Sequence, residues 1–129
     1  MPQQSPQNPP PDSDRSRVEW LLDAERAELE RGVDGTRSEL DDVRDARADG
    51  SADDEHDPEG STLSADWSRI EGIRTGLIAR LGENEGAFGR LADGTYGECT
   101  RCTRTIGAAR LEARPSAALC IECASELHP

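Results

Sequence analysis

Four cysteines arranged as two Cys-x-x-Cys pairs constrain this chain more than any other feature of its sequence. Cys99 pairs with Cys102 and Cys120 with Cys123, and seventeen residues separate the two pairs. A two-residue gap lets a tight turn direct both sulfurs at one ion, and two such turns complete the tetrahedron of a structural zinc site. We therefore predict one structural Zn²⁺ held by four thiolates, with no position left open for a water or a substrate.

Two other states of the cysteines are possible, namely free buried thiols and two disulfides. Disulfides are rare in a reducing cytosol, and the N-terminal sequence "MPQQSPQNPPPDSD" contains no apolar signal segment. The chain also lacks a run of eighteen apolar residues, so its sequence predicts neither export nor membrane insertion. We predict a cytoplasmic protein in which zinc thiolates are favoured over both alternatives.

Four arginines lie in the same region as the cysteines: Arg101, Arg104, Arg110 and Arg114. Four thiolates around Zn²⁺ leave a local charge of about −2, which nearby cations would offset. We predict charge compensation near the metal by these arginines, with a solvent-facing or partner-facing role for one or two of them as the alternative. The segment is too small to be held by burial, so the metal is expected to supply its folding energy.

Composition limits what the rest of the chain can do. Only 33% of the 129 residues are hydrophobic and 3% are aromatic, which is too little for a large globular core. The formal net charge of −12 opposes binding to nucleic-acid phosphates and to anionic membranes. We predict no direct DNA or RNA binding and no membrane binding, and we expect a partner protein with a basic surface.

Two stripes of mostly apolar residues, at alternating steps of four and three, predict two long helices. The first stripe is Leu22, Arg26, Leu29, Val33, Thr36, Leu40 and Val43, and the second is Leu63, Trp67, Ile70, Arg74, Leu77, Leu81, Asn84, Phe88 and Leu91. Residues 49–61 between them, "DGSADDEHDPEGS", hold Gly, Pro, carboxylates and no apolar residue larger than Ala, which predicts a turn.

The predicted fold is mainly α: an antiparallel helical coiled-coil hairpin followed by a small C4 zinc finger. Each narrow apolar seam must be covered, and the other helix is the nearest partner along the chain. We assign residues 1–14 to a disordered tail, 15–93 to the hairpin with an acidic tip at 49–61, and 94–129 to the zinc-finger domain. We predict a monomer, with a compact bundle or pairing with a second copy as the alternatives.

The segment "GTYGECTRCTRTIGAARLEARPSAALCIECA" resembles the C4 zinc finger of the DksA/TraR family of bacterial RNA polymerase regulators. The shared residues are Tyr96-Gly97-x-Cys99-x-x-Cys102, Ile106-Gly107, Arg110-Leu111-x-Ala113-Arg114-Pro115 and Cys120-Ile121-x-Cys123. Upstream of the finger, the resemblance lies in the architecture alone, because a coiled-coil hairpin directly precedes the finger in the family.

This resemblance implies a zinc-binding transcription regulator. Members of the family insert the hairpin into the secondary channel of RNA polymerase without binding promoter DNA. Their hairpin tip carries an Asp-x-x-Asp-x-Ala pattern, which here corresponds to Asp54-x-x-Asp57 with Glu59 in place of Ala. Asp54, Asp57 and Glu59 are therefore the predicted partner-binding tip residues. A rival pattern, Asp42-x-x-Asp45, overlaps the first seam.

The sequence after the finger differs from that of the DksA members of the family. Those proteins continue into a further helix, whereas only "ASELHP" follows Cys123 here. Contacts that such a helix makes with polymerase or with the alarmone ppGpp are not expected, so binding of ppGpp is not among our predictions.

Other functions are compatible with the same residues. One is a zinc-stabilised interaction module that binds a protein other than polymerase, and another is a thiol redox sensor in which oxidation of the cysteines ejects zinc. An enzyme is not predicted: His56 and His128 stand beside no nucleophile in a recognisable motif, and no glycine-rich phosphate loop occurs.

Overall fold

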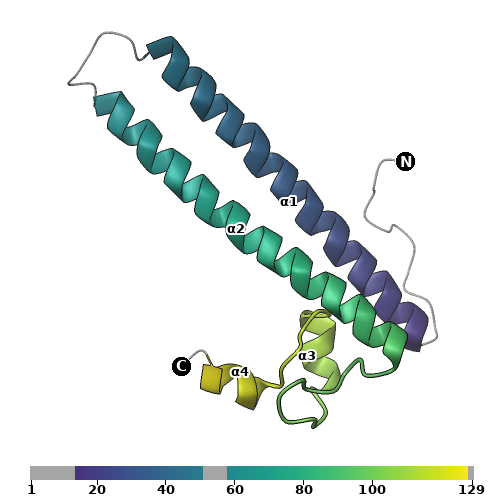
Figure 1. Cartoon of the computed structure of the whole chain (residues 1–129). Coiled ribbons are helices and arrows are strands. Elements are labelled where there is room, and N and C mark those ends of the chain that lie inside the picture. Colours follow the sequence, from purple (N-terminus) through teal and green to yellow (C-terminus); the bar gives the residue numbers. More distant parts are fainter. Residues whose placement is uncertain (1–13, 51–57, 128–129) are drawn as a thin grey trace. The chain divides into compact units, whose positions relative to one another are not determined.

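The computed structural model describes residues 14–50 and 58–127, which contain two long and two short helices (Figure 1). The long helices are α1, Asp14–Gly50, and α2, Pro58–Asp93, and the short ones are α3, Ala108–Ala113, and α4, Ile121–Leu127. Within these residues the only β-type pairing is an isolated antiparallel bridge between Glu98 and Thr105. The predicted mainly α fold, with two long helices packed together ahead of a cysteine cluster, is confirmed.

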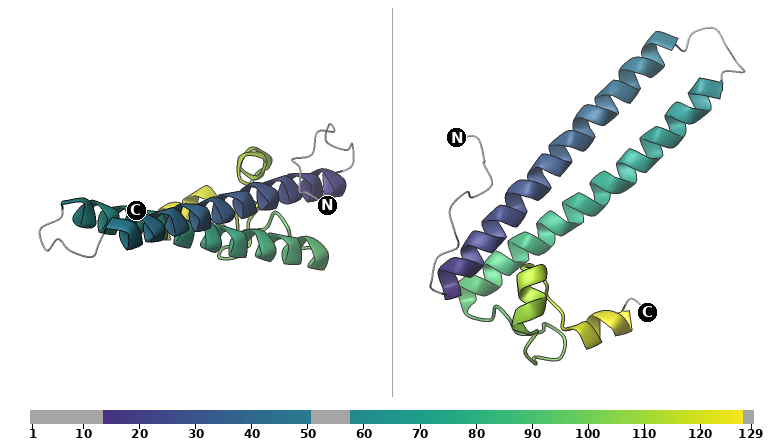
Figure 2. Two further views of the ribbon diagram at one scale, coloured as in Figure 1. Left: turned by 90° about the horizontal axis from the view of Figure 1, so that it is seen from above. Right: turned by 180° about the vertical axis from the view of Figure 1, so that it is seen from behind.

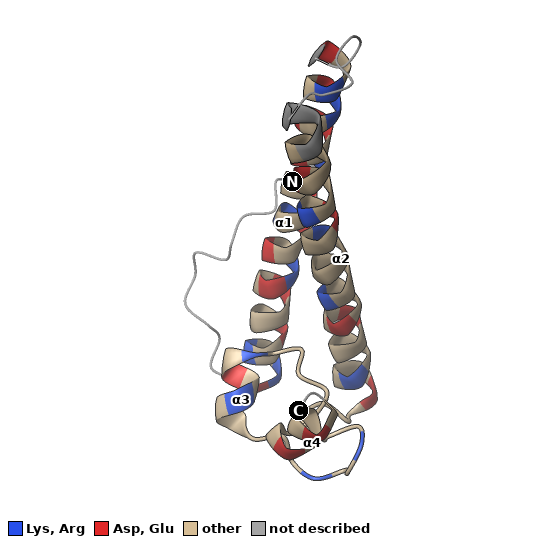
Figure 3. Ribbon diagram, turned by 90° about the vertical axis from the view of Figure 1, so that its left-hand side faces the viewer, with Lys and Arg blue, Asp and Glu red and all other residues tan. Residues whose placement is uncertain are grey.

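The chain divides into two compact units, and each contains part of both long helices. The terminal unit consists of Met1–Glu28 with Arg80–Pro129, and the middle unit is Leu29–Ala79. Within each unit the segments of α1 and α2 lie side by side, as two further views also show (Figure 2). Acidic and basic residues are interspersed along both long helices (Figure 3), and none of the described helices has the length and apolar character needed to cross a bilayer.

An apolar seam holds the middle unit together. Leu40, Val43 and Ile70 form a buried cluster, against which the partly buried Leu63 and Trp67 pack. These five residues come from both predicted stripes, so the heptad-like steps of four and three identified the packed faces of the helices. Burial of each large apolar side chain contributes about 1.5 to 3 kcal/mol to the unit.

Polar residues at seam positions of the middle unit also find partners. The guanidinium of Arg74 donates a hydrogen bond of 3.3 Å to the backbone carbonyl of Val33 on the facing helix. Thr36 is 5% exposed and donates to the same carbonyl at 2.7 Å. Outside the stripe, the guanidinium of Arg44 lies 5.8 Å from the ring centroid of Trp67, within cation–π range. The polar positions in the seam are thus satisfied by directed contacts.

The terminal unit has a seam of different character. Leu22 and Ala87 are fully buried, and Asn84, a polar residue, is only 1% exposed. Arg26 lies over the ring of Phe88, with its guanidinium carbon 4.4 Å from the ring centroid. The predicted stripe therefore continues into this unit, but polar and charged groups occupy much of it.

The predicted turn at residues 49–61 is too long. Helix α1 extends through Gly50 and α2 begins at Pro58, so both ends of that segment are helical. Proline suits the first position of a helix because its φ angle is preset and its missing N–H would have no partner there. Of the predicted tip residues, Asp54 and Asp57 lie outside the described residues, as do residues 1–13 of the predicted tail at 1–14. The last residue of that predicted tail, Asp14, is helical and begins α1. Glu59 falls in the first turn of α2.

Candidate metal centre

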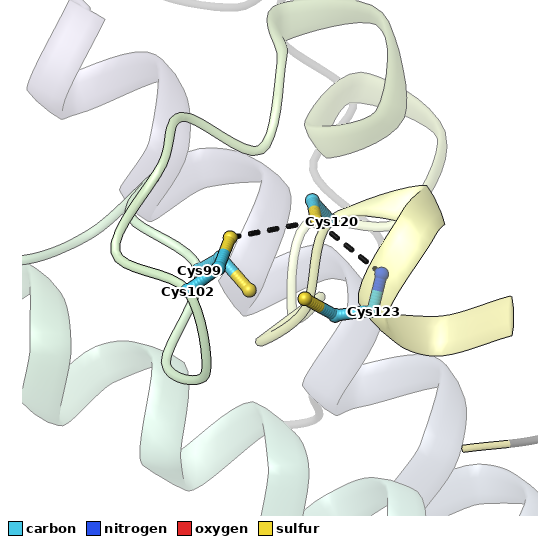
Figure 4. A group of neighbouring side chains, drawn as sticks. All are labelled: Cys99, Cys102, Cys120 and Cys123. Carbon is cyan, nitrogen blue, oxygen red and sulfur yellow. Dashed lines mark hydrogen bonds between the residues drawn. The ribbon is translucent and has the colours of Figure 1, made fainter. Parts of the chain in front are cut away.

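The four cysteines converge on one point in the terminal unit (Figure 4). Their sulfur atoms all lie within 4.8 Å of one another, and Cys102 Sγ is 3.8 Å from Cys120 Sγ. A tetrahedral zinc ion with Zn–S bonds of about 2.3 Å places its sulfurs about 3.8 Å apart. The donor set and its spacing therefore fit one structural Zn²⁺, as the spacing in the sequence predicted.

A tight turn presents the first cysteine pair. The backbone N–H of Cys99 donates to the carbonyl of Arg104 at 2.8 Å, and the N–H of Thr103 donates to the carbonyl of Cys99 at 2.9 Å. Thr103 has a φ of 65°, a left-handed conformation that β-branched residues rarely adopt. This backbone conformation at Thr103 completes the turn that brings the sulfurs of Cys99 and Cys102 close together.

The start of α4 presents the second pair. Cys120 precedes the helix, and Cys123 lies in its first turn. The backbone N–H of Cys123 donates to Cys120 Sγ at 3.5 Å, while the N–H of Ala124 donates to the Cys120 carbonyl at 2.9 Å. A backbone donor at the helix start thus points at a sulfur that would carry negative charge when it binds metal.

The apolar core around the thiols is small. Ile106 and Ala117 are the buried residues that pack with Cys99, Cys120 and Cys123, and partly buried Cys102, Leu111 and Leu119 surround them. So few apolar side chains cannot offset the backbone entropy of ordering the segment. A bound metal would supply the missing free energy, about 10 to 16 kcal/mol in comparable peptides.

The protein environment separates the proton affinities of the thiols. Backbone hydrogen bonding from Cys102 lowers the pKa of the Cys99 thiol to about 6. Burial, together with hydrogen bonds from the other cysteines, raises the pKa of Cys123 to about 12. Of these two thiols, Cys99 therefore becomes a thiolate more readily, whereas Cys123 would need a bound cation to displace its proton.

Of the four arginines predicted to compensate the metal charge, Arg104 is the one whose guanidinium interacts with a cysteine of the cluster. A hydrogen bond with the thiol of Cys102, and the charges of Cys102 and Glu122, raise the pKa of its guanidinium. The same side chain lies 3.6 Å from the carboxylate of Glu122 at the start of α4. Arg104 thus faces both the cysteine cluster and an acidic neighbour.

The other three arginines have direct partners elsewhere in the terminal unit. Arg101 forms a 2.7 Å ion pair with Glu126, and Arg114 lies 3.9 Å from Glu83 on α2. Arg110 donates to the carbonyl of Leu119 at 2.9 Å and so shapes the segment before the second pair. Charge compensation by these three side chains stays a prediction.

A polar cluster beside the second cysteine pair was not predicted from the sequence. Glu25 of α1, Asn84 of α2 and Ser116, just ahead of the second pair, share hydrogen bonds there. Only Asn84 gave a signal in the sequence, because it interrupts an otherwise apolar stretch of the second stripe. Ser116 and Glu25 lie 91 positions apart, so no local pattern links them.

Together, the fold and site define a zinc-finger protein in which a four-cysteine metal centre follows a pair of long helices. Residues 94–127 match the prokaryotic dksA/traR C4-type zinc finger. The finger is therefore of the DksA/TraR type, and the family resemblance seen in the sequence is confirmed.

A solved structure extends the likeness beyond the finger. The structure of transcription factor DksA2 from Pseudomonas aeruginosa is similar to this chain with a TM-score of 0.73 and 26% sequence identity. The similarity covers 90% of this chain and 84% of the DksA2 chain, so it includes the long helices as well as the finger. No curated protein sequence matches this chain.

Proposed function

We propose that this protein is a transcription regulator that binds RNA polymerase and acts through the secondary channel of the enzyme. The observation that carries this proposal is the combination of a DksA/TraR-type finger with a long helix pair. A protein described as a transcription factor shares that combination over 90% of this chain.

The geometry of the middle unit supports entry into a narrow channel. The residues described in this unit belong to two helices that pack through an apolar seam, and the unit contains no segment of α3 or α4. Each helix with its side chains is about 10 to 12 Å across. The chain also carries a formal net charge of −12, and this negative charge favours association with a channel that is lined by basic residues.

We assign the action on the enzyme to the carboxylates between the two long helices. Asp54 and Asp57 are the proposed tip residues, with Glu59 where the family pattern has Ala. Carboxylate oxygens are preferred ligands of Mg²⁺, so the tip would act on the catalytic Mg²⁺ of polymerase or on the residues that hold it. The finger supports the hairpin and takes no part in chemistry, because all four zinc positions would be filled by sulfur.

The remaining parts of the proposal concern what the protein does not do. We propose a monomeric, cytoplasmic and non-enzymatic regulator that binds neither DNA nor RNA directly, since its acidic surface would repel phosphates. Promoter DNA alone should therefore not shift in a gel with the purified protein, whereas a polymerase–promoter complex should change its lifetime or output when the protein is added.

Binding to purified core RNA polymerase at low salt, followed by transcription in vitro, tests the proposal. The wild-type protein should associate and change transcript yield, and a protein that occupies the secondary channel should compete with it. The Asp57→Ala variant should still associate but lose the effect on transcription. Asp45→Ala, in the rival pattern on α1, is the matched control and should behave as wild type. Absence of association at low salt, where charge attraction is least screened, would contradict the proposal.

A further inference from the structure

A carboxylate on α1 joins three separate segments of the terminal unit. One oxygen of Glu25, Oε1, accepts a hydrogen bond from Asn84 Nδ2 at 2.9 Å and another from the hydroxyl of Ser116. Asn84 Nδ2 also donates to the carbonyl of Leu22 at 3.0 Å. Both donors are buried, with Asn84 1% and Ser116 6% exposed, so the hydroxyl of Ser116 and the second N–H of the Asn84 amide are satisfied by this acceptor.

The segment that Glu25 holds leads directly into the metal centre. Ser116 precedes Cys120 by four positions. Ala117 packs in the buried cluster of the cysteines. The carbonyl of Ala118 accepts hydrogen bonds from the backbone N–H of Thr100 at 2.9 Å and from its hydroxyl at 3.1 Å. Thr100 lies inside the first Cys-x-x-Cys turn, so this short segment contacts both cysteine pairs.

Two further contacts fix the start of the same segment. The guanidinium of Arg90 on α2 donates to the carbonyl of Ser116 at 3.4 Å, and the hydroxyl of Tyr96 donates to the carbonyl of Pro115 at 2.7 Å. Pro115, Ser116 and Ala117 are all buried. The hydroxyl of Ser116, however, reaches α1 through Glu25, and that bond ties the position of the segment to the first long helix.

We propose that Glu25, which binds no metal itself, sets the zinc affinity of the finger by holding Ser116 in place. Zinc binding must order the segment that carries Cys120, and a segment already held by α1 and α2 has less entropy to lose. By thermodynamic linkage, bound zinc strengthens the contacts of Glu25 by the same factor. Glu25 is thus a positioning residue that couples the metal centre to the helices, whichever partner the protein has.

Competition between the full-length protein and a chromophoric zinc chelator tests this coupling. Glu25→Ala should weaken zinc binding about tenfold, a typical size for coupling between two sites. Glu25→Gln should stay close to wild type, because both donors bond to Oε1 and the glutamine side chain offers a carbonyl oxygen at that position. Glu28→Ala removes an exposed carboxylate from the same helix and is the matched control that should leave zinc affinity unchanged.

A double-mutant cycle separates this coupling from a general loss of stability. Ser116→Ala should weaken zinc binding as much as Glu25→Ala does, and the double variant should show no further loss. Losses that simply add, or an unchanged zinc affinity in either single variant, would overturn the proposal. If Glu25→Ala does not fold, the two single variants Ser116→Ala and Glu25→Gln are compared instead. Ser116→Ala should weaken zinc binding, and Glu25→Gln should stay close to wild type. Hydrogen exchange provides the reciprocal measurement: zinc removal should raise exchange around Leu22 and Glu25 in wild type more than in Ser116→Ala.

Discussion

The two units of this protein are stabilised by different kinds of interaction, although the same two helices run through both. The middle unit rests on an apolar seam centred on Leu40, Val43 and Ile70. The terminal unit buries Asn84 and Ser116, and in the core of its finger three cysteines are joined by only two other buried residues, Ile106 and Ala117. The difference shows that a helix pair can stabilise itself by burial, whereas a finger of this size depends on directed bonds to metal and polar groups.

This difference has a consequence for how each unit fails. Removal of an apolar contact from a seam costs a few kcal/mol and leaves the remaining contacts in place. Loss of the metal removes the main source of folding free energy for the finger in a single step. Without bound zinc, the four thiols contribute far less to the stability of the finger. A change made in one unit, with the other unit monitored at the same time, therefore tests whether the two units lose their structure independently.

The largest effect is expected from zinc removal. A strong chelator, or the Cys123→Ala substitution, should unfold residues 94–127 because the finger loses stabilisation on the order of 10 kcal/mol. Hydrogen exchange measured peptide by peptide, together with zinc release, checks this. The middle unit should keep most of its protection. Ser125→Ala, at an exposed site on α4, is the control, and equal loss of protection in both units would show that the units do not differ as described.

In the middle unit, Ile70→Ala should cost about 3 kcal/mol, since it leaves a cavity in the buried seam. The side chain of Ile70 is 3% exposed, whereas that of Ile73 on the same helix is 46% exposed. Ile73→Ala is therefore the matched control, with an expected change within about 0.5 kcal/mol. Urea denaturation followed by helicity measures both variants, and zinc affinity should stay unchanged in each. A weaker zinc site in Ile70→Ala would contradict the separation of the two units.

A smaller effect is expected at Tyr96, the single tyrosine of the chain. Tyr96→Phe removes the hydrogen bond to Pro115 and should cost about 1 kcal/mol. Burial, followed by the charge of Glu25, raises the pKa of Tyr96 above its ordinary value of 10. The contribution of the protonated hydroxyl to the free energy of unfolding is therefore complete below pH 10, and it is lost as the pH rises through the pKa of the folded state. Ultraviolet absorbance of tyrosinate should give a midpoint above pH 10 in wild type. A midpoint at or below pH 10 would show that the hydroxyl of Tyr96 is not shielded from solvent as its partial burial requires.

The smallest effects are expected from two glycines in the middle unit. Gly76→Ala should stabilise the protein by about 0.5 kcal/mol, because an added methyl group meets no atom within 4 Å beyond the nearby backbone of its own helix and lowers the conformational entropy that α2 loses on folding. Gly32→Ala should gain less, since its added carbon would lie 3.0 Å from Leu77 Cδ1 across the seam. Thermal unfolding compares the two variants directly. An equal or greater gain at Gly32 would mean that the helices in this unit pack more loosely than the structure shows.

Much of the fold followed from periodicity in the sequence. The steps of four and three selected Leu22, Leu40, Val43 and Ile70, all of which are buried, because side chains at those spacings must share one face of a helix. The ends of the predicted turn were wrong for the same physical reason. Residues near Gly50 and Pro58 carry no apolar stripe, so the pattern could not show that their backbone stays helical.

The spacing of the cysteines along the chain was enough to predict the metal centre, because a two-residue gap fixes how far apart paired sulfurs can lie and two such pairs satisfy one tetrahedral ion. It could not determine which polar groups support that centre. The bonds from Asn84 and Ser116 to Glu25 join residues far apart along the chain, and the partners of Arg101 and Arg110 depend on side-chain directions that arise only after packing. Local spacing encodes ligands, whereas the tertiary structure alone decides which distant groups meet to hold those ligands in place.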